Sequence, residues 1–304
     1  MKPDHAFTIR ENINDGTRLG PHLKRKDQEN SFAVEVEKIV EAKTPLPVSY
    51  DVNCSQKLYF SEFTYTDVLG GVYLKSQNTE VNARLMEQSV IACEDESYAT
   101  DSHAYLTDKY DLADIDGMPC PKKIVFLAGS NLLGVENKEA LLPMLYSDPS
   151  VVIKPHPNLT KEGLMILGRD YGWDKLIDPQ LSGYKLLQGC ETAYSTVNSE
   201  MGMISAYLKK PHADITSVFH FERLTYSAIH RLFQPMNIEH NHKTFARICN
   251  STTSGFIPPW ATNIEERVDG YIKLAMEIRN VFRPSFPDVK KWANQTVNVN
   301  KRKD

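Results

Sequence analysis

The sequence predicts an α/β fold whose second half contains a parallel β-sheet. Between residues 121 and 212, short runs rich in β-branched residues alternate with segments of helical periodicity, which is typical of βαβ units. Glycine and proline residues separate these runs and mark the turns between them. The composition is that of an ordinary globular protein, with 41% hydrophobic and 24% charged residues, and 304 residues suffice for two domains.

The elements of this half follow one another regularly. Lys123–Ala128 is apolar over most of its length, as expected of a buried parallel strand, and Val151–Ile153 has three β-branched residues in a row. Asp116–Pro121 precedes the first strand, and its one glycine and two prolines predict a linker. We expect further strands at Leu176–Ile177 and Thr192–Thr196, and helices at Lys138–Leu145, Leu159–Gly168 and Ser182–Gln188.

Residues 1–118 are expected to form a smaller N-terminal lobe. Apolar positions at helical spacing predict a helix over Phe32–Ala42, and two prolines shortly after it end the helix. A strand is expected at Val48–Val52 and a second helix at Asn82–Ala92. The pair Gly70-Gly71 marks a turn or a close approach of two backbone segments.

The rest of the chain completes the domain prediction. Residues 119–262 are expected to form the second lobe, and residues 263–304 a C-terminal helix that returns toward the first lobe, followed by a disordered tail. The periodicity of that helix spans Ile264–Val281. Between residues 214 and 249 we expect a strand at Val218–Phe221, a helix at Tyr226–Phe233, and loops around His240 and His242.

Charge and cysteine content restrict the function classes. The net charge is −4, which disfavours a surface made throughout for polyanions. The number of cysteines is odd and none has C-x-x-C spacing, so we expect neither a disulfide framework nor a zinc site. Neither a signal peptide nor a membrane span is evident, and we expect a cytoplasmic protein.

The segment Lys154-Pro155-His156-Pro157 follows directly on the predicted strand Val151–Ile153. Each proline lacks an amide donor and restricts the residue before it, so the strand ends there in a stiff turn. In open α/β sheets, ligands bind outside the carboxyl ends of the strands. A cation and an imidazole held there suit a phosphate or a pyrophosphate.

A second polar segment, Tyr194–Gly202, runs from a predicted strand into a helical pattern that ends at Lys210-Pro211. Its hydroxyl residues offer side-chain and backbone donors to an anion at a strand-to-helix junction. The hydroxyl candidates are Ser195, Thr196 and Ser199. Gly129, Ser130 and Asn131, at the end of the first predicted strand, are expected to face the same ligand.

Lys-Pro-His-Pro, followed some forty residues later by Ser-x-x-Gly and then Lys-Pro, resembles the nucleotide-binding half of GT-B glycosyltransferases with an HP motif. The most similar groups are capsule-type sialyl- and Kdo-transferases and polyol-phosphate transferases. The resemblance covers residues 121–212 and implies that His156 and Ser199 contact the phosphate of a donor nucleotide. Where the family has a ribose-binding glutamate this chain has Ile204, and Glu200 is the neighbouring candidate.

The resemblance also implies two Rossmann-like lobes with parallel sheets and the donor cleft between them. The implied reaction moves a sugar from a nucleotide-activated donor to a hydroxyl acceptor on a glycan or surface polysaccharide. Lys154 and His156 would stabilise the leaving phosphate, so we expect no metal and no cofactor. The family's base motif is absent, and the candidates for the catalytic base are Asp67, Glu94 and Asp116.

Two other functions fit the same segments. The first is a phage-type glycosyltransferase that acts on hydroxymethylated DNA bases. The lysine-rich segments 22–26 and 299–303 favour DNA binding, whereas the net negative charge disfavours it. The second is a non-catalytic protein that binds a nucleotide or a glycan and has lost the base. The sequence leaves the sugar, the acceptor and the oligomeric state open.

Overall fold

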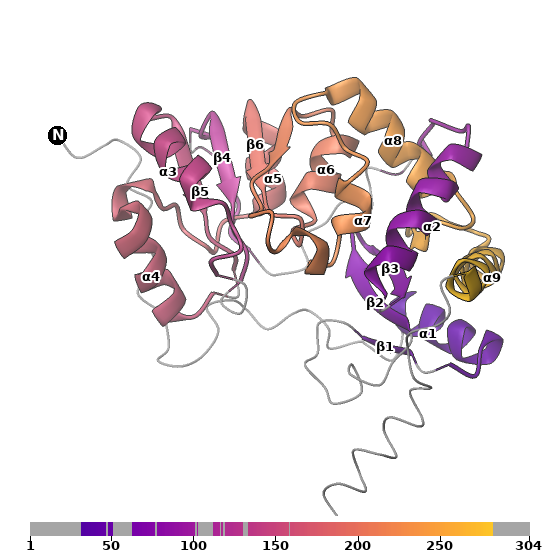
Figure 1. The fold of residues 1–304 in the computed structure, drawn as a ribbon. Coiled ribbons are helices and arrows are strands. Elements are labelled where there is room, and N and C mark those ends of the chain that lie inside the picture. Colours follow the sequence, from indigo (N-terminus) through magenta and orange to yellow (C-terminus); the bar gives the residue numbers. More distant parts are fainter. Residues whose placement is uncertain are drawn as a thin grey trace, which may run out of the picture. The chain divides into compact units, whose positions relative to one another are not determined.

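A computed structural model describes residues 32–46, 48–50, 63–76, 78–100, 102, 112–115, 117, 119–129, 133–157 and 159–281. The chain forms two compact units (Figure 1). Among the described residues, the parallel-sheet unit runs from 94 to 250, and the mixed-sheet unit combines residues 32–93 with 251–281. The described residues between 94 and 118, together with residues 251–262, are thus grouped differently from the lobes that the sequence predicts. The expected disordered tail lies outside the described residues.

The parallel-sheet unit has four strands: β4 (Lys123–Phe126), β5 (Val151–Lys154), β6 (Thr192–Ser195) and β7 (His212–Asp214). They lie in the order β5-β4-β6-β7, and every pair is parallel. The α/β fold with a parallel sheet is therefore confirmed. The predicted strand at Leu176–Ile177 is reduced to a single bridge between Ile153 and Leu176.

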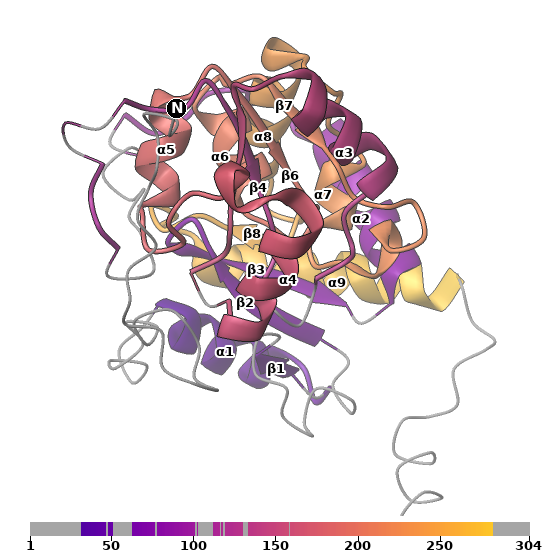
Figure 2. The ribbon, with the colours of Figure 1, turned by 90° about the vertical axis from the view of Figure 1, so that its left-hand side faces the viewer.

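Helices cover both faces of this sheet (Figure 2). Helices α3 (Lys138–Ser147) and α4 (Lys161–Tyr171) pack on one face through Leu141, Leu164 and Leu167, in a core that includes Val125 and Ile153. Helices α5 (Gly183–Gly189) and α6 (Met201–Tyr207) lie on the other face. The unit is completed by η5 (Trp173–Lys175), η6 (Phe221–Arg223), α7 (Ser227–His230) and α8 (Ile238–Asn250).

Two expectations for residues 214–249 are wrong. Residues 218–221 form a turn that runs into η6 rather than a strand, and Val218 and Phe219 point into solvent. His240 and His242 lie in helix α8, where Nε2 of His240 is 2.9 Å from the carbonyl oxygen of Leu232. Most residues of α8 are polar, so its apolar face, with Phe245, Ile248 and Cys249, is difficult to recognise in the sequence.

The mixed-sheet unit has strands β1 (Val48–Tyr50), β2 (Phe63–Val68), β3 (Gly71–Ser76) and β8 (Phe256–Ile257), in that order across the sheet. β1 and β2 are parallel, whereas β2–β3 and β3–β8 are antiparallel. The expectation of a second parallel sheet is therefore wrong for the described strands. A hairpin turn at Leu69-Gly70, with φ of 52° and 75°, reverses the chain between β2 and β3.

Gly71 explains how β8 reaches this sheet. A Cβ atom at Gly71 would overlap the carbonyl oxygen of Ile257 and lie 3.0 Å from Cα of Pro258. The Gly70-Gly71 pair thus serves both purposes considered for it, because Gly70 forms the turn and Gly71 permits the close approach.

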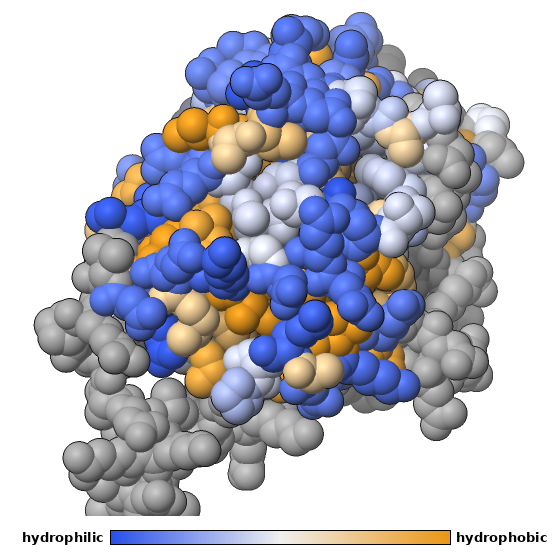
Figure 3. Space-filling model, turned by 90° about the vertical axis from the view of Figure 1, so that its right-hand side faces the viewer, coloured by the Kyte–Doolittle hydropathy of each residue, from blue (hydrophilic) through white to orange (hydrophobic). Residues whose placement is uncertain are grey.

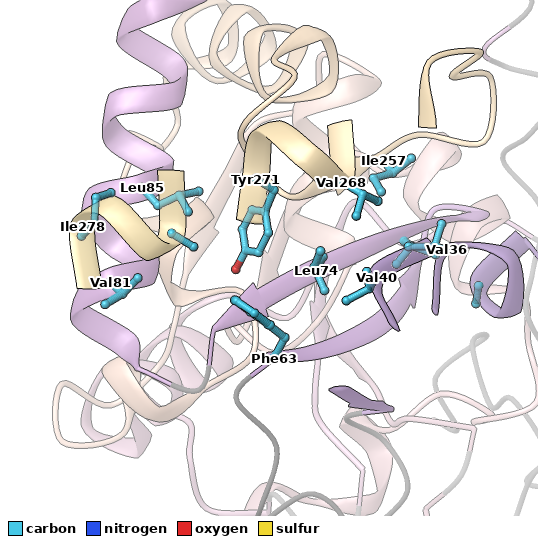
Figure 4. Close-up of a cluster of buried hydrophobic side chains, with 13 residues drawn as sticks. Val36, Val40, Phe63, Leu74, Val81, Leu85, Ile257, Val268, Tyr271 and Ile278 are labelled. Carbon is cyan, nitrogen blue, oxygen red and sulfur yellow. The ribbon is translucent and has the colours of Figure 1, made fainter. Parts of the chain in front are cut away.

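Helices α1 (Phe32–Lys43), α2 (Thr79–Ala92) and α9 (Ile264–Val281) pack in the mixed-sheet unit. Asn78 caps α2, since its side chain accepts from the amides of Glu80 and Val81. In the core, the ring of Tyr271 from α9 points toward Leu74 and Phe63 of the sheet (Figure 4). The rings of Phe63 and Tyr271 meet edge to face with centroids 6.0 Å apart.

Hydrophilic residues cover most of the face in Figure 3, and the hydrophobic residues there form separate patches. Among the described residues, no helix combines the length and the apolar character needed to cross a bilayer.

Candidate functional site

The carboxyl edge of the parallel sheet gathers the segments that the sequence singled out. Phe126 at the end of β4 pairs with Lys154 at the end of β5 and with Ser195 at the end of β6. Gly129, His156 and Thr196 follow these strand ends by one to three residues, so they leave the same edge of the sheet.

The strand order reverses at this edge. The chain leaves β4 through α3 to reach β5 on one side, and it later returns to place β6 on the other side of β4. The helices that follow β4 and β6, α3 and α6, lie on opposite faces of the sheet (Figure 2). The carboxyl ends of β4 and β6 therefore flank a topological switch point, the position where open α/β sheets bind ligands.

His156 lies in a turn beside this point. Its side chain is half-buried, whereas Pro155 and Pro157 on either side are buried. The carbonyl oxygen of His156 accepts from the amide of Leu159 at 3.0 Å. Lys154, the last residue of β5, is only 3% exposed, and its Nζ donates to the carbonyl oxygens of Pro155 and Pro179, each at 2.9 Å.

The segment after β6 divides into buried and accessible residues. Ser195 is fully buried, with Oγ 2.9 Å from Nε2 of His212. Thr196 is also fully buried and its hydroxyl donates to Oδ1 of Asn198 at 2.7 Å. Ser199 and Glu200 are half-buried, and Oε1 of Glu200 accepts from the hydroxyl of Tyr184 at 2.9 Å. Ser199 and Glu200 are thus better placed than Ser195 and Thr196 to meet a ligand.

A buried histidine pair lies behind Ser195. The rings of His212 and His230 are 5.8 Å apart, and Nε2 of His230 has no hydrogen-bond partner among the described residues. Burial lowers the pKa of His212 to about 4. Burial lowers the pKa of His230 to about 3, and repulsion from His212 in its protonated form adds to this effect. Both rings are therefore neutral at pH 7.

The edge also contains residues that the sequence analysis did not assign. Asp214 ends β7, pairs with Ser195, and accepts from the amide and hydroxyl of Thr216 at 3.0 and 2.6 Å. Burial raises the pKa of the Asp214 carboxyl group. The hydroxyl of Thr216 in turn accepts from the amide of Val197 at 2.9 Å, which ties the loops after β6 and β7. Sequence analysis missed Asp214 and Thr216 because β7, with only three residues, shows no strand period.

The two described candidates for the catalytic base, Asp67 and Glu94, belong to different units. Asp67 is in β2 of the mixed-sheet unit, and its side chain is not among the described ones. Glu94 follows α2, belongs to the parallel-sheet unit and is exposed. Asp116 lies outside the described residues, as do Ser130 and Asn131. The identity of the base therefore stays a prediction.

The described residues contain no group of three or more His, Cys, Asp or Glu side chains that could hold a metal ion. His240 and His242 are directed to different backbone carbonyls, those of Leu232 and Ala206.

Comparisons with known proteins add no assignment. The chain matches no protein-family model, and no curated protein is significantly similar to it.

Proposed function

We propose that this protein is a glycosyltransferase that takes a sugar from a nucleotide-activated donor and transfers it to a hydroxyl acceptor. One observation carries the proposal. Gly129, His156 and Thr196, which come from three distant segments, follow the carboxyl ends of adjacent parallel strands where the strand order reverses. That position suits a nucleotide phosphate.

The half-buried side chain of His156 suits a phosphate oxygen for two reasons. The buried prolines on either side fix the backbone, so little entropy is lost when a ligand binds. An imidazole N–H donates to a phosphate oxygen, and such charge-assisted bonds contribute about 1.5–3 kcal/mol.

The proposed reaction balances without a further co-reactant. The acceptor oxygen forms a bond to the anomeric carbon while the bond from that carbon to the donor phosphate breaks. The phosphate takes the electron pair, and His156 stabilises the developing charge. A carboxylate, for which Asp67, Glu94 and Asp116 are the candidates, receives the proton of the acceptor hydroxyl. The scheme routes no step through a metal.

A ligand screen tests the proposal directly. CMP, CDP, UDP and GDP are added to the full chain, and melting temperatures are recorded, because a ligand that binds the native state raises the apparent stability. We expect one nucleotide to raise the melting temperature of the wild type and to have little effect on His156→Ala.

His242→Ala is the matched control, since His242 is also half-buried but lies in α8 with Nδ1 3.0 Å from the carbonyl oxygen of Ala206. This variant should respond to the nucleotide like the wild type. Binding of a nucleotide without sugar transfer from the corresponding nucleotide sugar would instead favour a non-catalytic nucleotide-binding protein. No response of the wild type at millimolar nucleotide would refute the proposal.

A further inference from the structure

The turn at Pro155–Pro157 has a hydrogen-bond donor for each of its three carbonyl groups. Lys154 Nζ donates to Pro155, the amide of Leu159 to His156, and Nε2 of Gln180 to Pro157, at 2.9, 3.0 and 3.5 Å. The two prolines contribute no amide donors of their own. The conformation of the turn therefore depends on donors from outside it, and two of these involve the segment Asp178–Gln180.

Lys154 links the turn to that segment. Its ammonium group donates to the carbonyl oxygen of Pro155 and to that of Pro179, 25 residues further along the chain. Burying an ammonium group costs free energy unless its N–H groups donate hydrogen bonds, so these two bonds fix the direction of the side chain. The side chain of Ile153 packs in the core with α3 and α4. Because successive residues of a strand point to opposite faces, the side chain of Lys154 points to the face that carries α5 and α6.

The segment Asp178–Gln180 is itself held firmly. Oδ1 of Asp178 accepts from the amide of Gln180 at 2.7 Å, and the carbonyl oxygen of Asp178 accepts from the amide of Leu181 at 3.2 Å. The amide of Ile177, just before it, donates to the carbonyl oxygen of Ile153 in β5. Lys154 thus ties the turn to a segment that is anchored on the same strand.

We propose that Lys154 is a positioning residue: it holds His156 in place by binding the carbonyl oxygens of Pro155 and Pro179, and it does not contact the ligand. This inference rests on the proposed function for the identity of the ligand, but not for the order of the turn. It assigns Lys154 a different role from the phosphate contact that its sequence position suggests.

A measurement without ligand tests the positioning itself. With ¹³C-labelled histidine in the full chain, the Cε1–H signal of His156 is identified by its absence in His156→Ala. We expect one sharp signal in the wild type, and a broadened or split signal in Lys154→Met, which keeps the length of the side chain but loses its charge and donors. Lys154→Arg keeps the positive charge and the N–H donors, and its His156 signal should be nearly as sharp as that of the wild type.

Lys210→Met is the matched control, because Nζ of Lys210 also donates to a backbone carbonyl, that of Cys190, at 2.9 Å. Lys210 precedes β7 and therefore lies at the opposite, amino-terminal edge of the sheet. Lys210→Met should lower the free energy of unfolding and leave the His156 signal unchanged. If Lys154→Met does not fold, Gln180→Ala removes the side-chain donor to the carbonyl oxygen of Pro157 and should broaden the same signal. An unchanged His156 signal in the folded variants would overturn the proposal.

A double-mutant cycle then tests the link to the ligand, using the nucleotide that binds the wild type. Lys154→Met should weaken its binding about tenfold, whereas in the His156→Ala background the same change should have less than about a twofold effect, because coupled residues are not additive. An undiminished effect in that background would show that Lys154 contacts the ligand and would overturn the proposal. If no nucleotide binds the wild type while the His156 signal responds as expected, the proposed function fails and the positioning role stands.

Discussion

The imidazole ring of His230 occupies the space beside the α-carbon of Gly202. A Cβ atom at Gly202 would overlap Cε1 of His230, lie 2.8 Å from its Nε2, and lie 3.1 Å from Cε1 of His212. The glycine of the Ser-x-x-Gly segment is therefore required by the packing of α6 against the buried histidine pair. Its presence in the motif does not by itself indicate a ligand contact.

Gly202→Ala should therefore destabilise the protein. Overpacking of this kind costs about 1–3 kcal/mol, and we expect a lower melting temperature and a lower midpoint of urea unfolding. Gly183→Ala is the control, because the nearest atom to a Cβ there, Cε of Met201, is at an ordinary contact distance of 3.4 Å. Gly183→Ala should be neutral or stabilising by about 0.5–1 kcal/mol. Equal effects of both changes would contradict this packing argument.

The same histidine pair makes stability depend on pH. In the unfolded chain both residues bind protons below a pKa of about 6.5. In the folded protein their pKa values are lowered to about 4 and about 3. The unfolded state thus binds more protons as pH falls from 6.5 toward 4, and stability is lost over that range.

Between pH 7.5 and 5 we expect a loss of about 2 kcal/mol for each of the two histidines, measured by urea unfolding. His230→Leu should remove roughly half of this loss. The window lies above the ordinary range of carboxyl groups, so Asp148, whose pKa is lowered by its bond to Lys123, contributes little there. A free energy of unfolding that is flat from pH 7.5 to 5 would be incompatible with two buried neutral histidines.

His156→Ala tests the candidate site by turnover. Loss of a charge-assisted bond to the donor phosphate should lower the rate of sugar transfer about ten- to a hundredfold, at about 1.4 kcal/mol per factor of ten. The melting temperature should change little, because the half-buried side chain contributes little to the core. Activity that falls only in proportion to the folded fraction would indicate that the Pro-His-Pro segment is a structural turn.

Gly71→Ala tests the junction in the mixed-sheet unit. The added methyl group would overlap the carbonyl oxygen of Ile257, so β8 would have to move away from β3. We expect a loss of about 2 kcal/mol or more, because the obstructing atom is backbone and moves less readily than a side chain. Hydrogen exchange at the amide of Leu74, which donates to the carbonyl oxygen of Gly255, should become faster. Wild-type exchange at Leu74 would count against this mechanism.

Long periodic segments were predictable from the sequence, whereas short or polar elements were not. The 3.6-residue period gave helix α9 its observed bounds, Ile264–Val281, and the aliphatic run of Val151–Ile153 indicated β5 correctly. Strand β7 has three residues, too few for a period to show. The β2–β3 hairpin was missed because Leu69, a buried aliphatic residue, occupies a turn position where asparagine or glycine is the usual signal.

For the candidate site, the sequence indicated which segments come together and not what each side chain does. Parallel pairing follows from βαβ alternation, so the common edge of His156 and Thr196 was predictable. Burial depends on the tertiary packing of distant segments. The side chains of Ser195 and Thr196 are buried, and the ammonium group of Lys154 donates to the carbonyl oxygen of Pro179. No local sequence pattern connects Lys154 with Pro179.

The division of the mixed-sheet unit into residues 32–93 and 251–281 has a consequence for biosynthesis. Its core needs Val268, Tyr271 and Ile278 from α9, and strand β3 gains its outer neighbour only with β8. On the ribosome, the β2–β3 hairpin and α1 therefore emerge long before their partners, with the edge of β3 unpaired and apolar side chains exposed to solvent. At about 5–20 residues per second this interval lasts on the order of ten seconds or more, a period in which the nascent chain is a natural client for chaperones.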